Sequence, residues 1–149
     1  MAKASDRIDS KLPWIFDGVP LAEPPAGAIG FIYRVTDTRT GKKYIGKKLF
    51  NFRRTKTIAG KKKKVTIASD WLSYYGSNKT LQEEIKAGGV EYFHREIIKL
   101  CYSKTECNYE ETRCIIEERA LFRDDYYNDW VTFKVTRKHI ESATKKNAF

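Results

Sequence analysis

Two strand-like segments on either side of a short polar turn restrict the fold of this chain more than any other feature. Residues 30–36, GFIYRVT, are rich in the β-branched and aromatic residues that strands favour, and the turn DTRTG with Gly41 follows them. Residues 43–50, KYIGKKLF, are read as the partner strand. Segments joined in this way pair most readily as an antiparallel hairpin. The sequence therefore predicts a sheet in which these two strands are neighbours.

Helical segments and a further strand follow the hairpin. Ser69 and Asp70 offer an N-cap for a short helix, WLSYY, which Gly76 ends. The pattern then predicts a second helix over residues 79–87 and a strand over residues 92–101. The predicted strand thus separates these two helices from the next helix along the chain.

A capping pattern predicts the last and longest helix. Ser103 is followed three residues later by Glu106, which is typical of a capping box, and the helix is expected to reach about Phe122. Residues 130–136, WVTFKVT, are the last strand candidate. The order β-β-α-α-β-α-β indicates an α+β domain, with an antiparallel sheet flanked by helices, rather than a doubly wound one.

The length and the proline distribution suggest how the chain is divided. With 149 residues, 41% of them hydrophobic, the chain can form one domain with its own core. All four prolines lie within residues 1–29, which we expect to form an extended, irregular N-terminal arm. Residues 30–136 are then the domain, and residues 137–149 a C-terminal tail.

The composition also points to a cellular compartment. No apolar run approaches the roughly 20 residues of a membrane span, so we expect no membrane partner. The first residues contain no apolar segment typical of a signal peptide. The three cysteines, Cys101, Cys107 and Cys114, form no C-x-x-C pair. A reducing, cytoplasmic location is therefore expected.

Positive charge is concentrated in one part of the chain. The net charge is +10, yet the segment from Arg34 to Lys64 has thirteen basic residues and one acid, Asp37. That segment therefore carries +12 and the remainder sums to −2. Localised positive charge favours binding to nucleic acid, whereas surface lysines kept for solubility are the alternative.

The last helix places carboxylates on an apolar face. A period of 3.6 residues puts Glu111 and Glu118 on the same face as Cys107, Cys114, Ile115, Leu121 and Phe122, while Glu110 and Glu117 flank that face in solvent. A carboxylate among apolar groups is costly unless it is paired. Either a structural salt bridge or a divalent cation with a catalytic role would explain Glu111 and Glu118.

Two tyrosine triplets on the predicted hairpin resemble a family signature. Phe31-Ile32-Tyr33 is followed, eleven residues after its tyrosine, by Tyr44-Ile45-Gly46. These triplets resemble the motifs of the GIY-YIG nucleases, although Phe31 stands where the family usually has glycine and Gly30 immediately precedes it. Other parts follow in family order over roughly residues 30–130. These are Arg54, the stretch SNKTLQEEIKAGG, the strand YFHREIIKL, Glu111 and Asn128.

The resemblance implies a small GIY-YIG-type domain that hydrolyses DNA with one divalent metal ion, Mg²⁺ or Mn²⁺. Glu111 would hold the metal and Arg54 would stabilise the phosphate in the transition state. Tyr33 would help to take the proton from the attacking water, and Tyr44 would position that water. A tyrosine needs nearby positive charge to lower its pKa from about 10. Lys47 and Lys48 would supply that charge.

The resemblance leaves several assignments open. Residues 55–68 look like a basic insertion, so Arg53, Lys48 or one of the lysines 61–64 could replace Arg54. Glu118 remains a rival to Glu111. Ile58 stands where many members have His or Tyr, and Tyr74 or Tyr75 could take that place. The residues expected to bind DNA are Lys47, Lys48, Arg53, Lys61, Lys62, Lys63 and Lys64.

The resemblance to phage intron-encoded homing endonucleases implies a phage origin. DNA specificity would come from the basic insertion, from the N-terminal arm or from a homodimer. Two other functions stay open. One is a catalytically silent nucleic-acid-binding protein with the same fold, and the other is an accessory protein that binds a host protein through charge complementarity.

Overall fold

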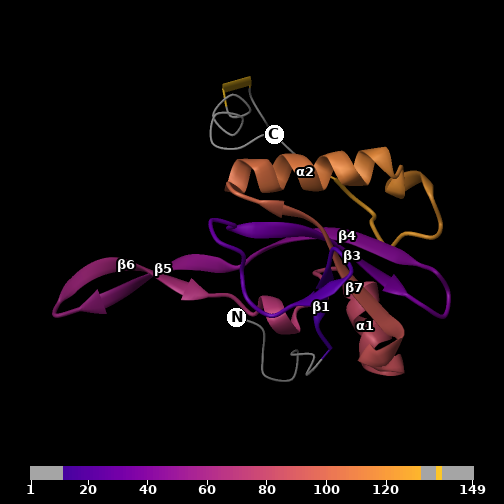
Figure 1. Cartoon of the computed structure of the whole chain (residues 1–149), viewed down its shortest axis with the longest axis horizontal. Helices are drawn as coiled ribbons and strands as arrows, with labels where there is room; N and C mark the ends of the chain where they lie inside the picture. Colours follow the sequence, from indigo (N-terminus) through magenta and orange to yellow (C-terminus); the bar gives the residue numbers. More distant parts are fainter. Residues whose placement is uncertain (1–11, 132–136, 139–149) are drawn as a thin grey trace.

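A five-stranded mixed sheet forms the centre of the computed structural model, which describes residues 12–131 and 137–138 (Figure 1). The strand order is β2-β1-β7-β3-β4. The pair formed by β1 and β7 is parallel and the other neighbours are antiparallel. The strands are β1 (Trp14–Phe16), β2 (Val19–Leu21), β3 (Gly30–Asp37), β4 (Lys43–Leu49) and β7 (Phe93–Cys101).

The hairpin predicted from the sequence is confirmed as β3 and β4, in a register that pairs Tyr33 with Gly46. The predicted α+β class is confirmed as well, because helices α1 (Lys79–Gly88) and α2 (Lys104–Glu117) pack on this sheet. The sheet is mixed rather than wholly antiparallel, since β1 adds a parallel pair. The expected order omitted this strand because residues 1–29 were read as irregular.

Side chains of β3 alternate between two cores on opposite faces of the sheet. Phe31, Tyr33 and Val35 pack with Leu81 and Ile85 of α1. Ile32, between them in sequence, packs with cysteines and Ile115 of α2. Figure 1 shows α2 along one side of the sheet and α1 on the other. Because both faces are covered, β3 is buried along most of its length.

Residues 14–21 contribute to the sheet, which corrects the expectation of an irregular arm over this stretch. Trp14 is fully buried, and its indole Nε1 donates to the Trp71 carbonyl at 2.6 Å. Asp17 and Gly18 both have positive φ and form the tight turn between β1 and β2. The first eleven residues of the expected arm lie outside the described residues.

A second, two-stranded sheet extends away from the body of the protein (Figure 1). It consists of β5 (Asn51–Ile58) and β6 (Lys61–Ala68), which form an antiparallel hairpin. The basic segment expected at about 55–68 comprises the outer half of β5, the turn and all of β6. The side chains of Lys61–Lys64 are exposed, whereas Val65 and Ile67 of the same strand are half-buried.

The remaining elements differ from the prediction at their ends. Only Trp71–Ser73 of the expected helix WLSYY is helical, as one 3₁₀ turn. The last helix starts as predicted, with Ser103 accepting from the Glu106 N–H at 3.1 Å. It ends at Glu117 because Arg119 adopts the left-handed conformation, and a 3₁₀ turn, Ala120–Phe122, follows. As a result, Leu121 and Phe122 are exposed.

Two further observations concern the predicted last strand and the membrane. Trp130 and Val131 are not in a strand, and the rest of the candidate 130–136 lies outside the described residues. Within the described ranges, none of the helices has the length and apolar character that would let it cross a membrane.

Candidate active site

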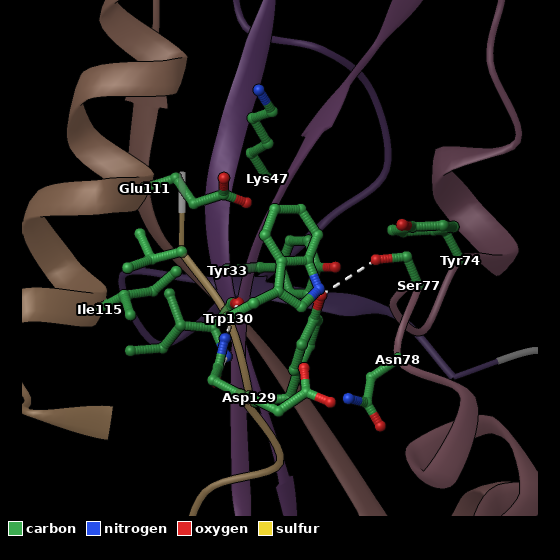
Figure 2. Close-up of a pocket in the computed structure, with 13 residues that line it drawn as sticks. Tyr33, Lys47, Tyr74, Ser77, Asn78, Glu111, Ile115, Asp129 and Trp130 are labelled. Carbon is green, nitrogen blue, oxygen red and sulfur yellow. Dashed lines mark hydrogen bonds between the residues drawn. The ribbon is translucent and has the colours of Figure 1, made fainter. Parts of the chain in front are cut away.

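A cavity of about 500 Å³ opens beside β4, at the free edge of the central sheet (Figure 2). Four separate parts of the chain line it: the β3–β4 hairpin, the loop before α1, the middle of α2, and the segment after the last 3₁₀ turn. The lining residues are Tyr33, Tyr44, Ile45, Lys47, Tyr74, Ser77, Asn78, Glu111, Ile115, Asn128, Asp129, Trp130 and Val131.

The outer backbone groups of β4 organise one wall of this cavity. Every second residue of an edge strand presents its N–H and C=O outward, and these groups need partners. Lys43 donates to the Asp125 carbonyl at 2.9 Å and accepts from the Tyr127 N–H at 2.7 Å. Asn128 bonds both backbone groups of Ile45. The Lys47 N–H donates to the Glu111 carboxylate.

Gly46 makes room for the tyrosine that faces it. Tyr33 is paired with Gly46 in the sheet, and its ring lies over the glycine. A Cβ built on Gly46 would lie 2.6 Å from Cζ of Tyr33 and 3.0 Å from Cε1 of Tyr44. Since real Cβ atoms do not approach neighbours so closely, the glycine allows the Tyr33 side chain to cross β4 toward the cavity.

Three tyrosines and a serine form a connected set of hydroxyl groups in the cavity. The Tyr33 and Tyr74 hydroxyls are hydrogen-bonded to each other. The Ser77 hydroxyl bonds to Tyr74 and lies 3.0 Å from the Tyr44 hydroxyl. Of the two tyrosines that the sequence left open for the place of Ile58, Tyr74 lines the cavity and Tyr75 does not. Tyr75 itself is buried under the Arg95 guanidinium, 4.1 Å from its ring.

The pKa of Tyr33 is raised well above its usual value of 10.0, which corrects the expectation that lysines would lower it. Burial is the largest cause, and the neighbouring Tyr74, Tyr44 and Glu111 add to it. Burial also raises the pKa values of Tyr44 and Tyr74. All three hydroxyls are therefore protonated near neutral pH and can donate hydrogen bonds.

Glu111 and Glu118 have different surroundings, although both were expected on one face of the helix. Glu111 is half-buried in the cavity, and burial raises its pKa while the charge and backbone N–H of Lys47 oppose that rise. Glu118 lies at the end of α2, outside the cavity, 3.6 Å from both Arg34 and Arg123. Glu118 thus has the structural ion pairs that the sequence left as one explanation.

Glu110 was expected in solvent, but its side chain is buried. It accepts from Nε of Arg113 at 2.5 Å and pairs with Lys99 at 3.3 Å. Lys99 of β7 and Arg113 of α2 thus both bind the Glu110 carboxylate. The helical period of 3.6 residues cannot reveal a partner such as Lys99, which lies on another element.

The expected cations are divided between the cavity and the hairpin. Lys47 lines the cavity, and Lys48 lies beside it, with its Nζ 2.7 Å from Asp70 and 4.0 Å from the centre of the Tyr74 ring. Arg54 lies on β5, exposed, with its guanidinium 4.7 Å from the Phe52 ring centre, and it does not line the cavity. Arg53 and Lys61–Lys64 are likewise exposed on the hairpin.

Sequence reasoning missed Ser77, Asp129 and Trp130. Asp129 and Trp130 directly follow Asn128, and they enter the cavity because that asparagine holds its segment against β4. Ser77 lies next to Asn78, whose side chain accepts from the Leu81 N–H at 3.0 Å at the start of α1. The stretch SNKTLQEEIKAGG, which begins at Ser77, was the sequence signal that included this residue.

The cavity offers oxygen donors to a cation. Glu111 and Asp129 both line it, together with tyrosine and serine hydroxyls. Over residues 12–131 and 137–138, no group of three or more His, Cys, Asp or Glu side chains is placed to hold a metal ion. A metal ion in the cavity would therefore keep several water ligands, as Mg²⁺ commonly does.

The chain was compared with known proteins. Residues 14–131 match the family described as "Putative endonuclease segE, GIY-YIG domain". This match includes β1, which residues 30–130 of the resemblance had left out. No curated protein and no solved structure matches the chain.

Proposed function

The chain belongs to the GIY-YIG nuclease superfamily, and from this premise we propose that it is a metal-dependent endonuclease that hydrolyses phosphodiester bonds in DNA. One observation carries the proposal. Tyr33, Tyr44 and Glu111 come from β3, β4 and α2, yet all three line one open cavity.

The donor set fits a magnesium-type ion. Glu111 would hold the ion, with Asp129 as a second carboxylate on the same cavity. Hard oxygen ligands and retained waters suit Mg²⁺, and Mn²⁺ accepts the same ligands. When bound, such an ion would neutralise the charge that develops on the leaving oxygen.

The hydroxyl groups would position the attacking water and carry its proton. The water oxygen would bond to phosphorus while the bond from phosphorus to the leaving oxygen breaks. The water proton would pass to one tyrosine hydroxyl, which in turn hands its own proton to the next hydroxyl in the set formed by Tyr33, Tyr74, Ser77 and Tyr44, and the last hydroxyl of the set would release its proton to solvent. The leaving oxygen would take a proton from solvent. A relay suits hydroxyls with raised pKa values, because no phenolate has to persist.

Lys47 would supply the positive charge that the family pattern assigns to Arg54. Lys47 lines the cavity, and its ammonium donates to Asn108, whereas Arg54 lies on the exposed hairpin outside the cavity. Fixed positive charge beside a phosphate stabilises the transition state, and removing one such group commonly costs about a hundredfold in turnover. Lys47→Ala should therefore lower turnover at saturating DNA by about that factor, and Arg54→Ala should mainly raise KM.

Cleavage of supercoiled plasmid with Mg²⁺ tests the proposal, with Glu118→Gln as the matched control for Glu111→Gln. We expect nicked or linear DNA from the wild type and from Glu118→Gln, and none from Glu111→Gln. Cleavage lost only in Glu118→Gln would overturn the assignment. A wild type that cleaves no DNA form with Mg²⁺ or Mn²⁺ would instead indicate a nucleic-acid-binding protein that has kept the fold.

Thermal unfolding gives a second readout that does not depend on DNA. A bound ion stabilises only the folded state, by about 2.7 kcal/mol at one hundred times its Kd. Mg²⁺ should therefore raise the Tm of the wild type and leave that of Glu111→Gln unchanged. An equal rise in both proteins would place the ion elsewhere.

A further inference from the structure

The β5–β6 hairpin is a free-standing ribbon. Its two strands have eight residues each, which corresponds to a length of about 26 Å at roughly 3.3 Å per residue. Ala59 and Gly60, both with positive φ, form the turn at its tip. Figure 1 shows the ribbon extending beyond the central sheet and both helices. Such a shape gives the described part of the chain a long, narrow surface that lies outside the central sheet and both helices.

One face of the ribbon is polar along its length. Residues that pair directly across an antiparallel ladder share a face, and faces alternate along each strand. Arg53 pairs with Thr66, Thr55 with Lys64, and Thr57 with Lys62. All six side chains are exposed, and all six can donate hydrogen bonds. We call these six residues the polar face.

The opposite face holds the ribbon together and carries the other lysines. Phe52, Val65 and Ile67 are half-buried near its base. Toward the tip this face presents Lys56, Lys61 and Lys63, all exposed. At the base, a hollow of about 250 Å³ is lined by Arg53 and Thr66 of the polar face together with Phe52 and Lys104. The outer part of the polar face, which consists of Thr55, Thr57, Lys62 and Lys64, does not line this hollow and is exposed.

We propose that this ribbon enters the major groove of double-stranded DNA with its polar face toward the base edges. This inference rests on the proposed function, from which DNA is taken as the partner. The major groove, about 12 Å wide, admits a two-stranded ribbon, whereas the minor groove is about half as wide. Arg and Lys side chains pair with the edge of guanine, and threonine contacts the thymine methyl group.

The lysines of the opposite face then lie near the groove walls. Long, flexible ammonium side chains bind phosphates without regard to sequence. The ribbon would thus read sequence with one face and bind the backbone with the other. Because β5 follows β4 directly, through Phe50, the ribbon would set the position of the cut relative to the sequence it reads.

DNA binding by Glu111→Gln protein tests this inference without requiring cleavage. The protein is mixed with a randomised double-stranded library, and the bound DNA is sequenced. We expect an enriched motif, and we expect methylation of guanine N7 within it to weaken binding by about tenfold, since that atom lies in the major groove. Binding that is insensitive to N7 methylation but is displaced by a minor-groove ligand would overturn the proposal.

A shortened ribbon provides the matched control. Arg54 and Val65 are directly paired, so replacing residues 55–64 by Asn-Gly should close the ribbon with a two-residue turn and leave the body intact. This variant should lose the motif, and the slope of log K against log salt should fall by roughly 0.9 for each lost phosphate contact. An unchanged motif and slope would place recognition elsewhere on the protein.

Variants on each face separate reading from backbone binding. Thr55→Ala with Lys62→Ala should alter the enriched motif. Lys56→Ala with Lys63→Ala should weaken binding equally for all sequences. If both pairs weaken all sequences equally, the polar face does not read bases. Plasmid cleavage by the wild type is measured beside these assays. It tests the nuclease proposal independently of the result for the ribbon.

Discussion

The Asn128 carboxamide bonds to both backbone groups of Ile45: its Nδ2 donates to the carbonyl at 2.8 Å, and its Oδ1 accepts from the N–H at 3.0 Å. A single side chain thereby makes the two backbone hydrogen bonds that a neighbouring strand would otherwise make with Ile45. Ile45 lies between Tyr44 and Gly46, so this contact holds the piece of β4 on which the cavity depends. The asparagine that completes the family pattern is, in this protein, a positioning residue.

Asn128→Ala should therefore weaken both folding and catalysis. Loss of two buried hydrogen bonds, with the backbone groups left unpaired, should lower the free energy of unfolding by about 2 kcal/mol. Asn128→Asp should be no better, because its carboxylate cannot donate to the Ile45 carbonyl. Urea unfolding and turnover at saturating DNA measure the two effects. Wild-type values in both variants would show that the hydrogen bonds between Asn128 and Ile45 are dispensable.

Gly46→Ala should move Tyr33. The added methyl group would overlap the Tyr33 ring, and overpacking of this kind costs about 1–3 kcal/mol. Gly41→Ala is the control, because a Cβ there meets no atom within 4 Å and costs only the strain of a φ of +78°. Both variants should be less stable in chemical denaturation, but only Gly46→Ala should lose turnover.

Arg95 should be needed for the position of Tyr74. Its guanidinium donates to the Leu72 carbonyl at 3.0 Å and the Tyr74 carbonyl at 2.8 Å, and lies 4.5 Å from the Trp14 ring centre. Burial lowers the Arg95 pKa to about 10, so the group is still charged at neutral pH.

Lysine at position 95 would keep the charge but lose the planar fork. Arg95→Lys should lower the free energy of unfolding by about 2 kcal/mol, because the carbonyls that Arg95 binds are left unpaired. Turnover should also fall, because Tyr74 is no longer held in position. Arg123→Lys, at the exposed pair with Asp125, serves as the control and should change stability by less than about 1 kcal/mol. Equal losses in both variants would contradict this account.

Asp37 should contribute to the loss of stability in acid. Burial opposes ionisation, but hydrogen bonds from the Arg39 side chain and backbone outweigh it and lower the Asp37 pKa below 3.8. Because the pKa is lower in the folded state, the stabilisation is present above the unfolded pKa and disappears as pH falls through the folded one. Asp37→Asn should therefore be less stable than the wild type at pH 7, with a gap that narrows as the pH falls below 3.8. Asp125→Asn, at a solvent-exposed pair, should show a smaller gap in the same denaturant titration.

Ala59→Asn should stabilise the ribbon. Ala59 has a φ of +52°, a conformation that costs an L-residue roughly 1–2 kcal/mol and that asparagine tolerates better. Asn-Gly is also the preferred pair for a turn with two positive φ values. Hydrogen exchange of the β5 and β6 amides should slow by about fivefold if 1 kcal/mol is recovered. Unchanged exchange would show that the tip does not limit opening of the ribbon.

The β1–β2 hairpin shows where sequence reasoning met its limit. Asp17-Gly18 is a strong hairpin signal between WIF and VPL, but the surrounding prolines favoured an irregular arm. Pro20 is tolerated because β2 is the outermost strand of its sheet, where one side needs no N–H donor. The positive φ of Arg119 ended α2 without the glycine that usually marks such an end.

The family resemblance pointed to Tyr33, Tyr44, Glu111 and Asn128, and all four line one cavity in the structure. It also pointed to Arg54, which lies outside that cavity because β5 leaves the body of the protein, and counting along the chain cannot detect this. The prediction that lysines lower the pKa of Tyr33 was also wrong. Burial raises this pKa, and the sequence does not show that the Tyr33 side chain is buried.

The parallel pairing of β1 with β7 has a consequence for the order of assembly. Residues 15 and 16 find their partners only when residues 96 and 97 have been synthesised, and Asn128 emerges later still. Contacts so distant in sequence form slowly and late. A nascent chain on the ribosome therefore exposes the residues of its basic ribbon, whose pairing is local, before its cavity is assembled. The most positively charged part of the chain is thus complete before the proposed site exists.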